Sequence, residues 1–408
     1  MECIRPDDTG VWRGRVKMRN IGLVFVAVAL GSVLAGPALL QEPPAPTRLR
    51  DLAPVVPVAY EMVPGWPKPF AESGFAFGGN SGVAIDSPDR IIVAQRGETR
   101  LPDPLPSGFE GWAGSIGINT LRETEMRVFQ NVIYAVNPQG EVIEVWDQWD
   151  HLFQGADGPG PHRVRISPYD PERRVWVVDE SQHQFFVFSN DGSELLHTFG
   201  EKGVQGSDET HLAGPQDVAF TPDGRVLVAD GFINGRVMIL DADLNYITEF
   251  GGEAGSGRGR FDVVHSIAVG PNGRIFVADR NNRRVQVFNE STRSTWYHPN
   301  ISPIGTWVGF DLPLDIIVNE YEVWVTDVGP DGASIMKFDL NGNPQAIQQL
   351  PREGSSRYTE MHSFAVDSNG VLYGADNQQG RIQKMVPKSD ADPTLLIGQP
   401  YVVAPADR

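Results

Sequence analysis

VHSIAVGPNGRIFVADRNNRRVQVF, residues 264–288, decides the fold of this chain. A short apolar run opens the stretch, an Asn-Gly turn follows at Asn272, and two further β-rich runs, Arg274–Asp279 and Arg284–Phe288, complete it. Short runs of β-branched and aromatic residues that alternate with tight turns are typical of antiparallel strands. The stretch therefore predicts consecutive strands of one small sheet.

The same pattern occurs six times along the chain. The opening strands of the copies begin at Ser81, His162, Gln216, His265, Leu314 and His362. From the second copy onward the steps between these anchor positions are 54, 49, 49 and 48 residues, and several copies add a fourth strand. A strand-only period of about 50 residues is typical of β-propeller blades and not of helical solenoids. The sequence therefore predicts an all-β fold, a six-bladed β-propeller over residues 59–388.

Two features depart from this regular spacing. The step from the first to the second copy is 81 residues, because an insertion over residues 101–130 separates the inner and outer strands of the first blade. A long loop on a rigid scaffold is either a lid or substrate wall, or surface decoration, and the sequence leaves both open. We also expect a strand near residues 57–63 to complete the last blade, because closure removes the exposed sheet edge.

The two ends of the chain lie outside the repeats. Basic residues between Arg13 and Arg19 precede an almost unbroken apolar run over residues 21–40. Residues 1–40 thus predict export, either by a signal peptide cleaved near Gly36 or by a membrane anchor whose basic flank stays in the cytoplasm. The expected location is periplasmic or extracellular, secreted or attached through residues 21–40. Proline-rich residues 41–58 predict a linker, and residues 389–408 a C-terminal tail.

Composition limits the classes of partner and of site. With 34 Lys and Arg against 52 Asp and Glu, the net charge is −18, and we expect no nucleic acid partner because a phosphate backbone must be met by clustered cations. The only cysteine, Cys3, precedes the apolar run, so the exported domain has no disulfide and no cysteine metal ligand. We expect a monomer.

Three of the anchor positions are histidines. His162, His265 and His362 stand in alternate copies, and in a six-bladed propeller they would converge on the channel about 120° apart. Three neutral imidazoles that leave a fourth position open describe a catalytic zinc site. The alternative is that each histidine only satisfies backbone groups at a strand end. The anchors of the intervening copies, Ser81, Gln216 and Leu314, would line the opening without competing as ligands.

These residues resemble a known family. The runs 161–164, 228–237, 264–268 and 277–286 are similar to the NHL-repeat propeller of peptidyl-α-hydroxyglycine α-amidating lyase, also called peptidylamidoglycolate lyase. The similarity covers about residues 82–385. It implies a metal-dependent lyase that splits a carbinolamide, R–CO–NH–CH(OH)–COO⁻, into an amide and glyoxylate. The substrate would be a small molecule or peptide of the α-hydroxyglycine type, and the three histidines would hold zinc or iron.

The resemblance also assigns roles to further positions. Arg96 and Arg280 match the arginines that hold the substrate carboxylate, a role that suits bidentate guanidinium donors. Phe232 stands where the family has its catalytic tyrosine and has no hydroxyl. The carbonyls of Val83 and Val164 match ligands of a structural calcium. The family's aspartate ligand is here Ser363, which weakens the expected calcium site.

Two functions of different classes therefore stay open. The first is an exported metal-dependent lyase of the peptidylamidoglycolate lyase type. The second is a non-catalytic NHL propeller that keeps a metal in its pore and binds a peptide or an envelope component. A calcium-dependent lactonase-like propeller is a weaker third, because that chemistry needs acidic and amide ligands at the pore.

Overall fold

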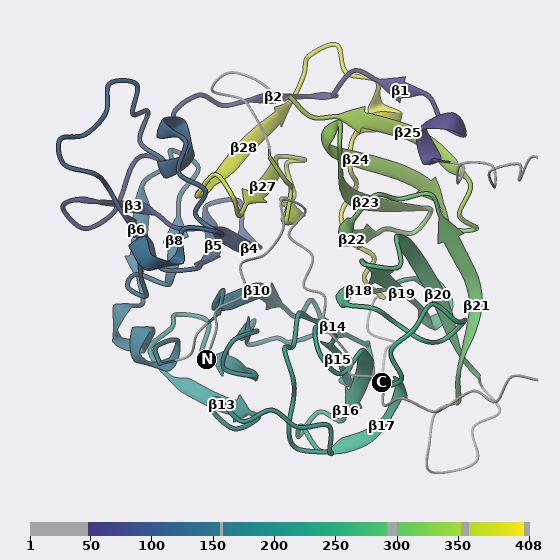
Figure 1. Cartoon of the computed structure of the whole chain (residues 1–408). Helices are drawn as coiled ribbons and strands as arrows, with labels where there is room; N and C mark the ends of the chain where they lie inside the picture. The colour runs from purple at the N-terminus through teal and green to yellow at the C-terminus, as the bar shows by residue number, and fades with distance from the viewer. Residues whose placement is uncertain (1–47, 156–157, 292–299, 352–358, 404–408) are drawn as a thin grey trace, which may run out of the picture. The chain divides into compact units, whose positions relative to one another are not determined.

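The computed structural model describes residues 48–155, 158–291, 300–351 and 359–403, all within one compact unit. In these ranges six sheets of four or five strands follow one another in chain order around a central axis (Figure 1). This is the all-β propeller arrangement that the repeats predict. No helix in the described ranges is long and apolar enough to span a membrane. The predicted export segment, residues 1–40, lies outside them.

The strands of each sheet run outward from the axis in sequence order. The first three sheets comprise β4 (Asn80–Ser87), β5 (Arg90–Gln95), β8 (Ile133–Val136) and β9 (Val142–Val145); β10 (Pro161–Ile166), β11 (Val175–Asp179), β12 (Gln184–Phe188) and β13 (Leu195–Phe199); and β14 (Asp217–Phe220), β15 (Val226–Asp230), β16 (Arg236–Leu240) and β17 (Tyr246–Gly251). The last three comprise β18 (Val264–Val269), β19 (Arg274–Asp279), β20 (Arg284–Ser291) and β21 (Asn300–Val308); β22 (Pro313–Val318), β23 (Glu322–Gly329), β24 (Gly332–Asp339) and β25 (Pro344–Gln349); and β26 (Ser363–Val366), β27 (Leu372–Asp376) and β28 (Arg381–Pro387). Short 3₁₀ helices lie at Leu49–Asp51, Ala113–Ile116, Thr124–Met126, Asp147–Leu152, Pro271–Gly273 and Pro393–Leu395.

The inner strands form a closed ring. Each of β4, β10, β14, β18, β22 and β26 packs beside the next, and β26 packs beside β4. The apolar core lies between neighbouring sheets; Val178 and Phe185 of the second sheet, for example, cluster with Val228 and Met238 of the third. Each such side chain, when fully buried, stabilises the fold by about 1.5–3 kcal/mol.

Segments before the first repeat complete two sheets. β2 (Tyr60–Met62) pairs antiparallel with β28, which confirms the predicted closing strand. β1 (Val55–Val56) pairs in parallel with β25, a contact that the sequence did not predict. Leu49 is also buried in the core of the fourth and fifth sheets. The part of the predicted linker from residue 49 onward is therefore packed on the propeller, because its few apolar residues find sheet edges to cover.

The backbone is irregular at the anchor positions. The pairing of the first two strands shifts register at Ser81, His162, His265 and Leu314 in four of the sheets. A bulge of this kind re-aims one side chain without ending the strand. The anchor side chains therefore turn toward the axis, while the rest of each inner strand packs between blades.

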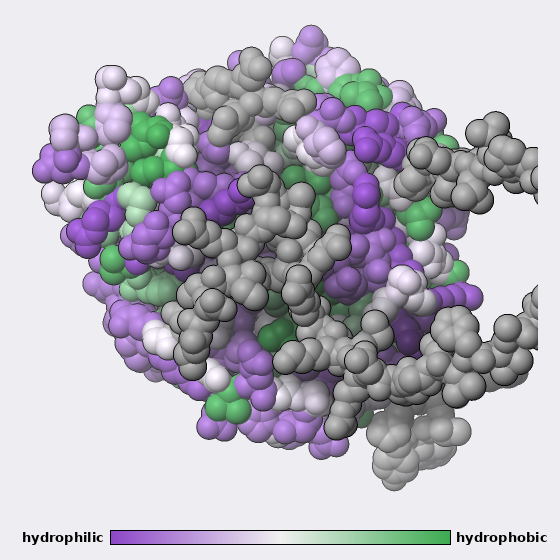
Figure 2. Space-filling model, in the orientation of Figure 1, coloured by the Kyte–Doolittle hydropathy of each residue, from purple (hydrophilic) through white to green (hydrophobic). Residues whose placement is uncertain are grey.

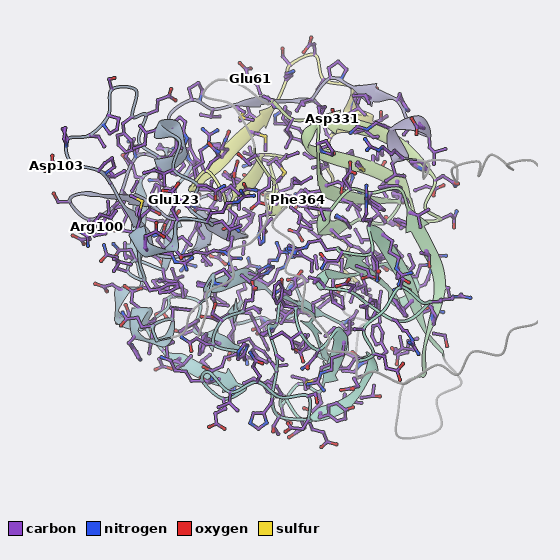
Figure 3. All side chains as sticks on the ribbon, viewed as in Figure 1. Glu61, Arg100, Asp103, Glu123, Asp331 and Phe364 are labelled. Atoms are coloured by element: carbon purple, nitrogen blue, oxygen red, sulfur yellow. The ribbon has the colours of Figure 1, made fainter. Side chains whose placement is uncertain are left out.

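The insertion of the first blade adds β7 (Arg127–Val128) to a small sheet with β6 (Glu98–Arg100) and β3 (Phe75–Phe77), which precede it in the chain. In Figure 3 the labelled residues Arg100, Asp103 and Glu123 mark this projection at the left of the ring. Thr120 Oγ1 donates to the Asn377 carbonyl at 2.7 Å, in the loop between β27 and β28. Asn377 directly follows β27, the second strand of its sheet, and the residues at such positions lie beside the anchor histidines. The insertion therefore forms part of the wall on the histidine side.

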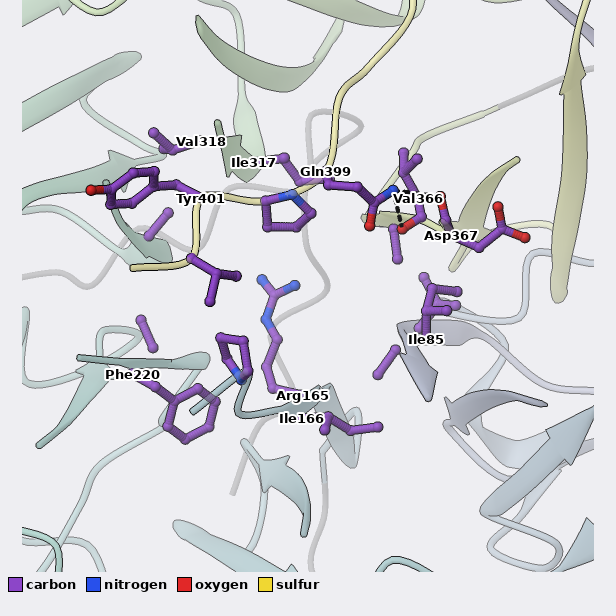
Figure 4. A pocket seen from close by; sticks show the side chains of 18 of the residues that line it. Ile85, Arg165, Ile166, Phe220, Ile317, Val318, Val366, Asp367, Gln399 and Tyr401 are labelled. Carbon is purple, nitrogen blue, oxygen red and sulfur yellow. Dashed lines mark hydrogen bonds between the residues drawn. The ribbon is translucent and has the colours of Figure 1, made fainter. Parts of the chain in front are cut away.

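The opposite end of the channel holds a cavity of about 440 Å³ lined by the ends of all six inner strands. The segment predicted as a C-terminal tail crosses it: Tyr401 N donates to the Val318 carbonyl at 2.7 Å, and Ile397 is buried. Figure 4 shows the Arg165 guanidinium in the middle of this cavity, among apolar side chains. Figure 2 shows the face of the propeller opposite this cavity. Polar residues dominate its described surface, with small apolar patches between them.

Candidate metal centre

The structure brings the three anchor histidines together on the axis. One ring nitrogen of each of His162, His265 and His362 lies within 4.8 Å of those of the other two. The ring centroids are 4.6–4.9 Å apart, and all three side chains are buried. The alternation of blades brings the three positions together, and the bulges at His162 and His265 aim two of the side chains.

The other nitrogen of each ring is held by the neighbouring blade. His162 Nδ1 lies 2.7 Å from the Gln216 carbonyl, His265 Nδ1 2.7 Å from that of Leu314, and His362 Nδ1 2.7 Å from that of Ser81. Because a carbonyl only accepts, each Nδ1 carries the proton and each Nε2 presents a lone pair. The intervening anchors Ser81, Gln216 and Leu314 thus orient the histidines through their main chains, a role that the sequence analysis missed.

The electrostatic environment keeps the imidazoles neutral. Burial, then the neighbouring histidines and Arg163, lower the pKa of His162 well below its usual value, and burial likewise lowers the pKa of His265 and His362. His265 Nε2 is buried and has no hydrogen-bond partner in the described residues. Three neutral ligands around one zinc at about 2.0–2.1 Å would be roughly 3.3 Å apart, so a small contraction fits the cluster to the ion. The donor set therefore fits zinc.

A second ring of side chains surrounds the histidines. It comprises one position at or near the end of the second strand of each sheet, directly after Gln95, Asp179, Asp230, Asp279, Asp327 or Asp376: Arg96, Glu180, Gly231, Arg280, Val328 and Asn377. Arg96 is buried, and its Nη2 lies 3.7 Å from Glu180 Oε2. Arg280 is half-buried, and burial lowers its pKa while Glu180 and Glu360 act in the opposite direction. Both predicted carboxylate-binding arginines thus face the histidine cluster.

Two buried carboxylates complete the site, and the sequence analysis missed both. Glu180 Oε2 lies 3.9 Å from His162 Nε2, and Glu360 stands two residues before His362. Burial raises the pKa of both carboxyls, and Arg96 and Arg280 oppose that shift. Glu360 Oε2 accepts from Gln378, whereas its Oε1 is buried without a partner in the described residues. Alignment of the position after each second strand would have revealed Glu180; no repeat signal marks Glu360.

Phe232 lies at the rim of the site and is 45 % exposed. Its backbone N–H donates to the Gly214 carbonyl at 3.0 Å, which fixes the turn, and the neighbouring Ile233 is 50 % exposed. The phenyl ring offers an apolar contact to a ligand and has no group that transfers a proton.

The residues expected to hold calcium do not fit that ion. Val83 and Val164 lie side by side in the inner strands β4 and β10, and Ser363 Oγ is buried without a partner in the described residues. However, Arg163 Nη1 donates to the His362 carbonyl directly before Ser363, at 2.9 Å. A calcium ion there would lie beside a buried cation, and hard divalent ions require anionic oxygen ligands.

Comparison with known proteins bears on these residues. The NHL repeat family matches residues 261–288, the stretch that carries His265 and Arg280. The chain is 34% identical over 231 residues to a probable peptidyl-α-hydroxyglycine α-amidating lyase of Caenorhabditis elegans, a match that covers 54% of this chain and 62% of that protein. The chain therefore matches the NHL repeat family in this stretch and resembles the α-amidating lyases.

Other relatives are similar over different shares of their length. The match to peptidyl-glycine α-amidating monooxygenase B of Xenopus laevis is 34% identical and covers 75% of this chain but 34% of that protein. For the mouse monooxygenase the covered share is 21%. NHL repeat-containing protein 3 of mouse is 24% identical over 81% of this chain and 85% of that protein. A solved streptogramin B lyase aligns with a TM-score of 0.44 at 13% identity, over 76% of this chain and 94% of that one.

Proposed function

We propose that this protein is an exported, metal-dependent lyase that splits α-hydroxyglycine-type carbinolamides into an amide and glyoxylate. The observation that carries the proposal is the convergence of three neutral, buried histidines, with two arginines facing the same point. The resemblance to named α-amidating lyases supports the reaction class. We propose that the protein acts as a monomer on a small molecule or peptide.

The reaction needs no oxidant. The hydroxyl of R–CO–NH–CH(OH)–COO⁻ loses a proton, its oxygen forms the aldehyde carbonyl of glyoxylate, and the C–N bond breaks with its electron pair moving to nitrogen. Nitrogen then takes up a proton to give R–CO–NH₂. Zinc or iron, held by His162, His265 and His362, would supply Lewis acidity at the hydroxyl oxygen.

The two arginines would hold the substrate carboxylate. Arg96 and Arg280 stand in the first and fourth blades, on opposite sides of the axis, so both can reach a group above the histidines. Each guanidinium keeps its charge and offers paired donors to a carboxylate. Glu180 and Glu360 balance these two charges, so the divalent metal would give the site the positive charge that attracts an anionic substrate.

Proton transfer needs a group other than Phe232. We assign this role to Glu180 on geometry, because its Oε2 lies near both His162 Nε2 and Arg96 Nη2, at 3.9 and 3.7 Å. There a carboxylate can take the hydroxyl proton while Arg96 holds the substrate. The assignment explains how a chain without the family's tyrosine could keep the reaction.

A second candidate is a non-catalytic propeller that keeps the metal and binds a peptide or an envelope component. Two observations favour it: Phe232 removes the hydroxyl, and Phe232 with Ile233 exposes apolar surface beside the site. The carboxylates that face Arg96 and Arg280 would also compete with an anionic substrate.

One experiment separates these functions. The purified protein is analysed for bound metal and assayed for glyoxylate release from an N-acyl-α-hydroxyglycine, before and after His265→Ala. We expect about one zinc or iron per chain in the parent, loss of that metal in the variant, and glyoxylate only from the parent. Metal without glyoxylate would support the binding protein, and a parent without stoichiometric metal would contradict both proposals. His197→Ala, at an exposed site on β13, is the matched control.

Export is proposed from residues 1–40 alone. Mass spectrometry of the protein recovered from the native host distinguishes the two routes, since a mature chain that begins near residue 40 indicates cleavage and an intact chain in the membrane fraction indicates an anchor. Recovery of the intact chain in the cytosol would contradict export.

A further inference from the structure

Arg163 lies on the axis directly beneath the histidines. Its side chain is fully buried, and its Nη1 donates to the His362 carbonyl at 2.9 Å. Its Nη2 donates to the carbonyls of His265 at 3.3 Å and Leu314 at 3.4 Å. One guanidinium therefore binds the main chain of two histidines and of the residue that orients His265.

A second arginine and two aspartates continue this cluster along the channel. Arg165 binds both oxygens of Asp217, at 2.9 and 2.7 Å, and Asp315 at 2.8 Å. Arg163 Nη1 lies 3.3 Å from Asp315 Oδ2. Against the effect of burial, Arg163 and Arg165 lower the pKa of Asp315 to about 2. Two cations thus balance two anions, and Arg165 borders the cavity at the far end.

We infer that the Arg163 and Arg165 guanidiniums occupy the place of a structural metal ion in the channel, and that Arg163 is a positioning residue for the three histidines. Five groups that could otherwise ligate a cation are already engaged: the carbonyls of His265, Leu314 and His362 and the carboxylates of Asp217 and Asp315. A covalently attached cation needs no binding equilibrium, so the fold would not depend on calcium. Ser363, which follows His362, is uncharged, and the Arg163 guanidinium beside it needs no further anion at that position.

The positioning role follows from rigidity. Burying a charge requires partners in fixed places, and Arg163 supplies that constraint to carbonyls of three blades. Each of these carbonyls belongs to an anchor residue, so movement of Arg163 would shift the Nε2 atoms against one another. This half of the inference rests on the metal site proposed above, whereas calcium independence does not.

The first test uses the unmodified full-length protein and separates calcium from zinc. The protein is stripped with EGTA, which removes both ions, and then receives zinc alone, calcium alone or both. We expect zinc alone to restore the melting temperature of the untreated protein, and calcium to add nothing and to produce no binding heat in calorimetry. A further rise of more than about 5 °C with calcium, or one calcium per chain by elemental analysis, would overturn the inference.

The second test measures zinc affinity by competition with a chromophoric chelator. We expect Arg163→Gln to weaken zinc binding about 10–100-fold, as loss of residues that orient ligands does. Arg225→Gln is the matched control, because Arg225 is partly buried and binds the carboxylates of Asp223 and Glu290, away from the histidines. It should lose stability and keep zinc affinity.

The outcomes are distinguishable. Unchanged zinc affinity in Arg163→Gln, or an equal loss in Arg225→Gln, would overturn the positioning role. If Arg163→Gln does not fold, Arg163→Lys keeps the charge and removes the planar fork, and it should show the affinity loss with smaller destabilisation. Failure of the lyase proposal would appear as absence of glyoxylate with both tests intact.

Discussion

At the scale of single residues, Glu180 and Phe232 make opposite predictions about proton transfer. If Glu180 accepts the hydroxyl proton, Glu180→Gln should lower kcat by at least about 100-fold, the usual contribution of a positioned base, with metal content unchanged. Phe232→Tyr should leave kcat as it is, because the proton already has an acceptor. The measurement is steady-state glyoxylate release with parallel metal analysis. A large gain in Phe232→Tyr together with a small loss in Glu180→Gln would return the role to the tyrosine position.

Arg280 supports a second prediction, about substrate binding. Arg280→Lys should raise KM for an N-acyl-α-hydroxyglycine by about 10–100-fold, since hydrogen bonds to charged groups are worth about 1.5–3 kcal/mol. The matched probe is the N-hydroxymethyl amide, which keeps the carbinolamide and lacks the carboxylate. Its kcat/KM should be the same in parent and variant. An equal effect on both substrates would show that Arg280 acts on the histidine site and not on the carboxylate.

The residues of the site were predictable to different degrees. The histidines were predicted because a repeat places equivalent residues at equivalent points, so a column in the sequence becomes a ring in space. Arg96 and Arg280 were predicted from the family resemblance. Glu360 and Arg163 carry no such signal, because each is used once. Their contacts cross the channel, from residue 163 to residues 265, 314 and 362, and those distances follow only from closure of the ring.

At the scale of elements, the last residue of the second strand is bound to the loop that leads into the inner strand of the same blade. Asp230 accepts from Ala213 N, Asp279 from Asp262 N and Asp376 from Thr359 N, three residues before an anchor in each case. In the second blade that position is Pro159, which has no N–H, and Asp179 Oδ2 is correspondingly left without a partner in the described residues. Asp230, Asp279 and Asp376 therefore hold the loops that lead into the anchors Gln216, His265 and His362.

Asp327, the equivalent carboxylate in β23 of the fifth blade, gives a prediction about pH. Burial raises the pKa of Asp327 to about 6, against the hydrogen bonds from Asp311 N and Leu312 N. A carboxyl whose pKa is raised in the folded state stabilises the fold at pH values below its pKa in the unfolded chain. That contribution is lost as the pH rises through about 6. The difference in free energy of unfolding between the parent and Asp327→Asn should therefore fall by roughly 1–3 kcal/mol between pH 4 and pH 7.

Denaturant titration at several pH values measures this difference. Asn keeps an amide oxygen for the two backbone donors, so the variant should fold. Asp243→Asn, at an exposed turn, is the control for the loss of one carboxylate from the surface. A flat profile for Asp327→Asn would mean that Asp327 stays ionised in the fold.

The strands and turns of each blade were predictable from the local sequence pattern. The bulges that aim the histidines depend on pairing between two strands, which no single strand encodes.

At the scale of the whole molecule, the propeller has two different ends. The histidine end carries the arginines, the carboxylates and the first-blade insertion. The far end is an apolar cavity of about 440 Å³ crossed by the C-terminal segment. The channel cluster of Arg163, Arg165, Asp217 and Asp315 lies between them. Ring closure, including the closing strand β2, was predicted from the repeats and explains the first end. The pairing of β1 and the packing of the C-terminal segment were not predicted, because these segments carry no repeat pattern.

Closure of the ring joins the two ends of the described chain at one side chain. Tyr60 of β2, beside β28, accepts a hydrogen bond at its hydroxyl from Ile397 N at 2.7 Å, and both residues are buried. Burial raises the pKa of Tyr60 to about 12, so the hydroxyl stays neutral. Tyr60→Phe leaves the Ile397 N–H buried without an acceptor and should destabilise the fold by about 1–3 kcal/mol.

Thermal denaturation of the full-length protein measures this loss, and limited proteolysis locates it, because the C-terminal segment after residue 396 should be cleaved first. Tyr321→Phe is the matched control, since Tyr321 is 70 % exposed and its ring lies on the surface. An equally small effect of both substitutions would mean that sheet pairing alone closes the ring. A selective loss in Tyr60→Phe would instead show that the N-terminal strand and the C-terminal segment stabilise each other, which ties the cover of the far cavity to closure of the blade that carries His362.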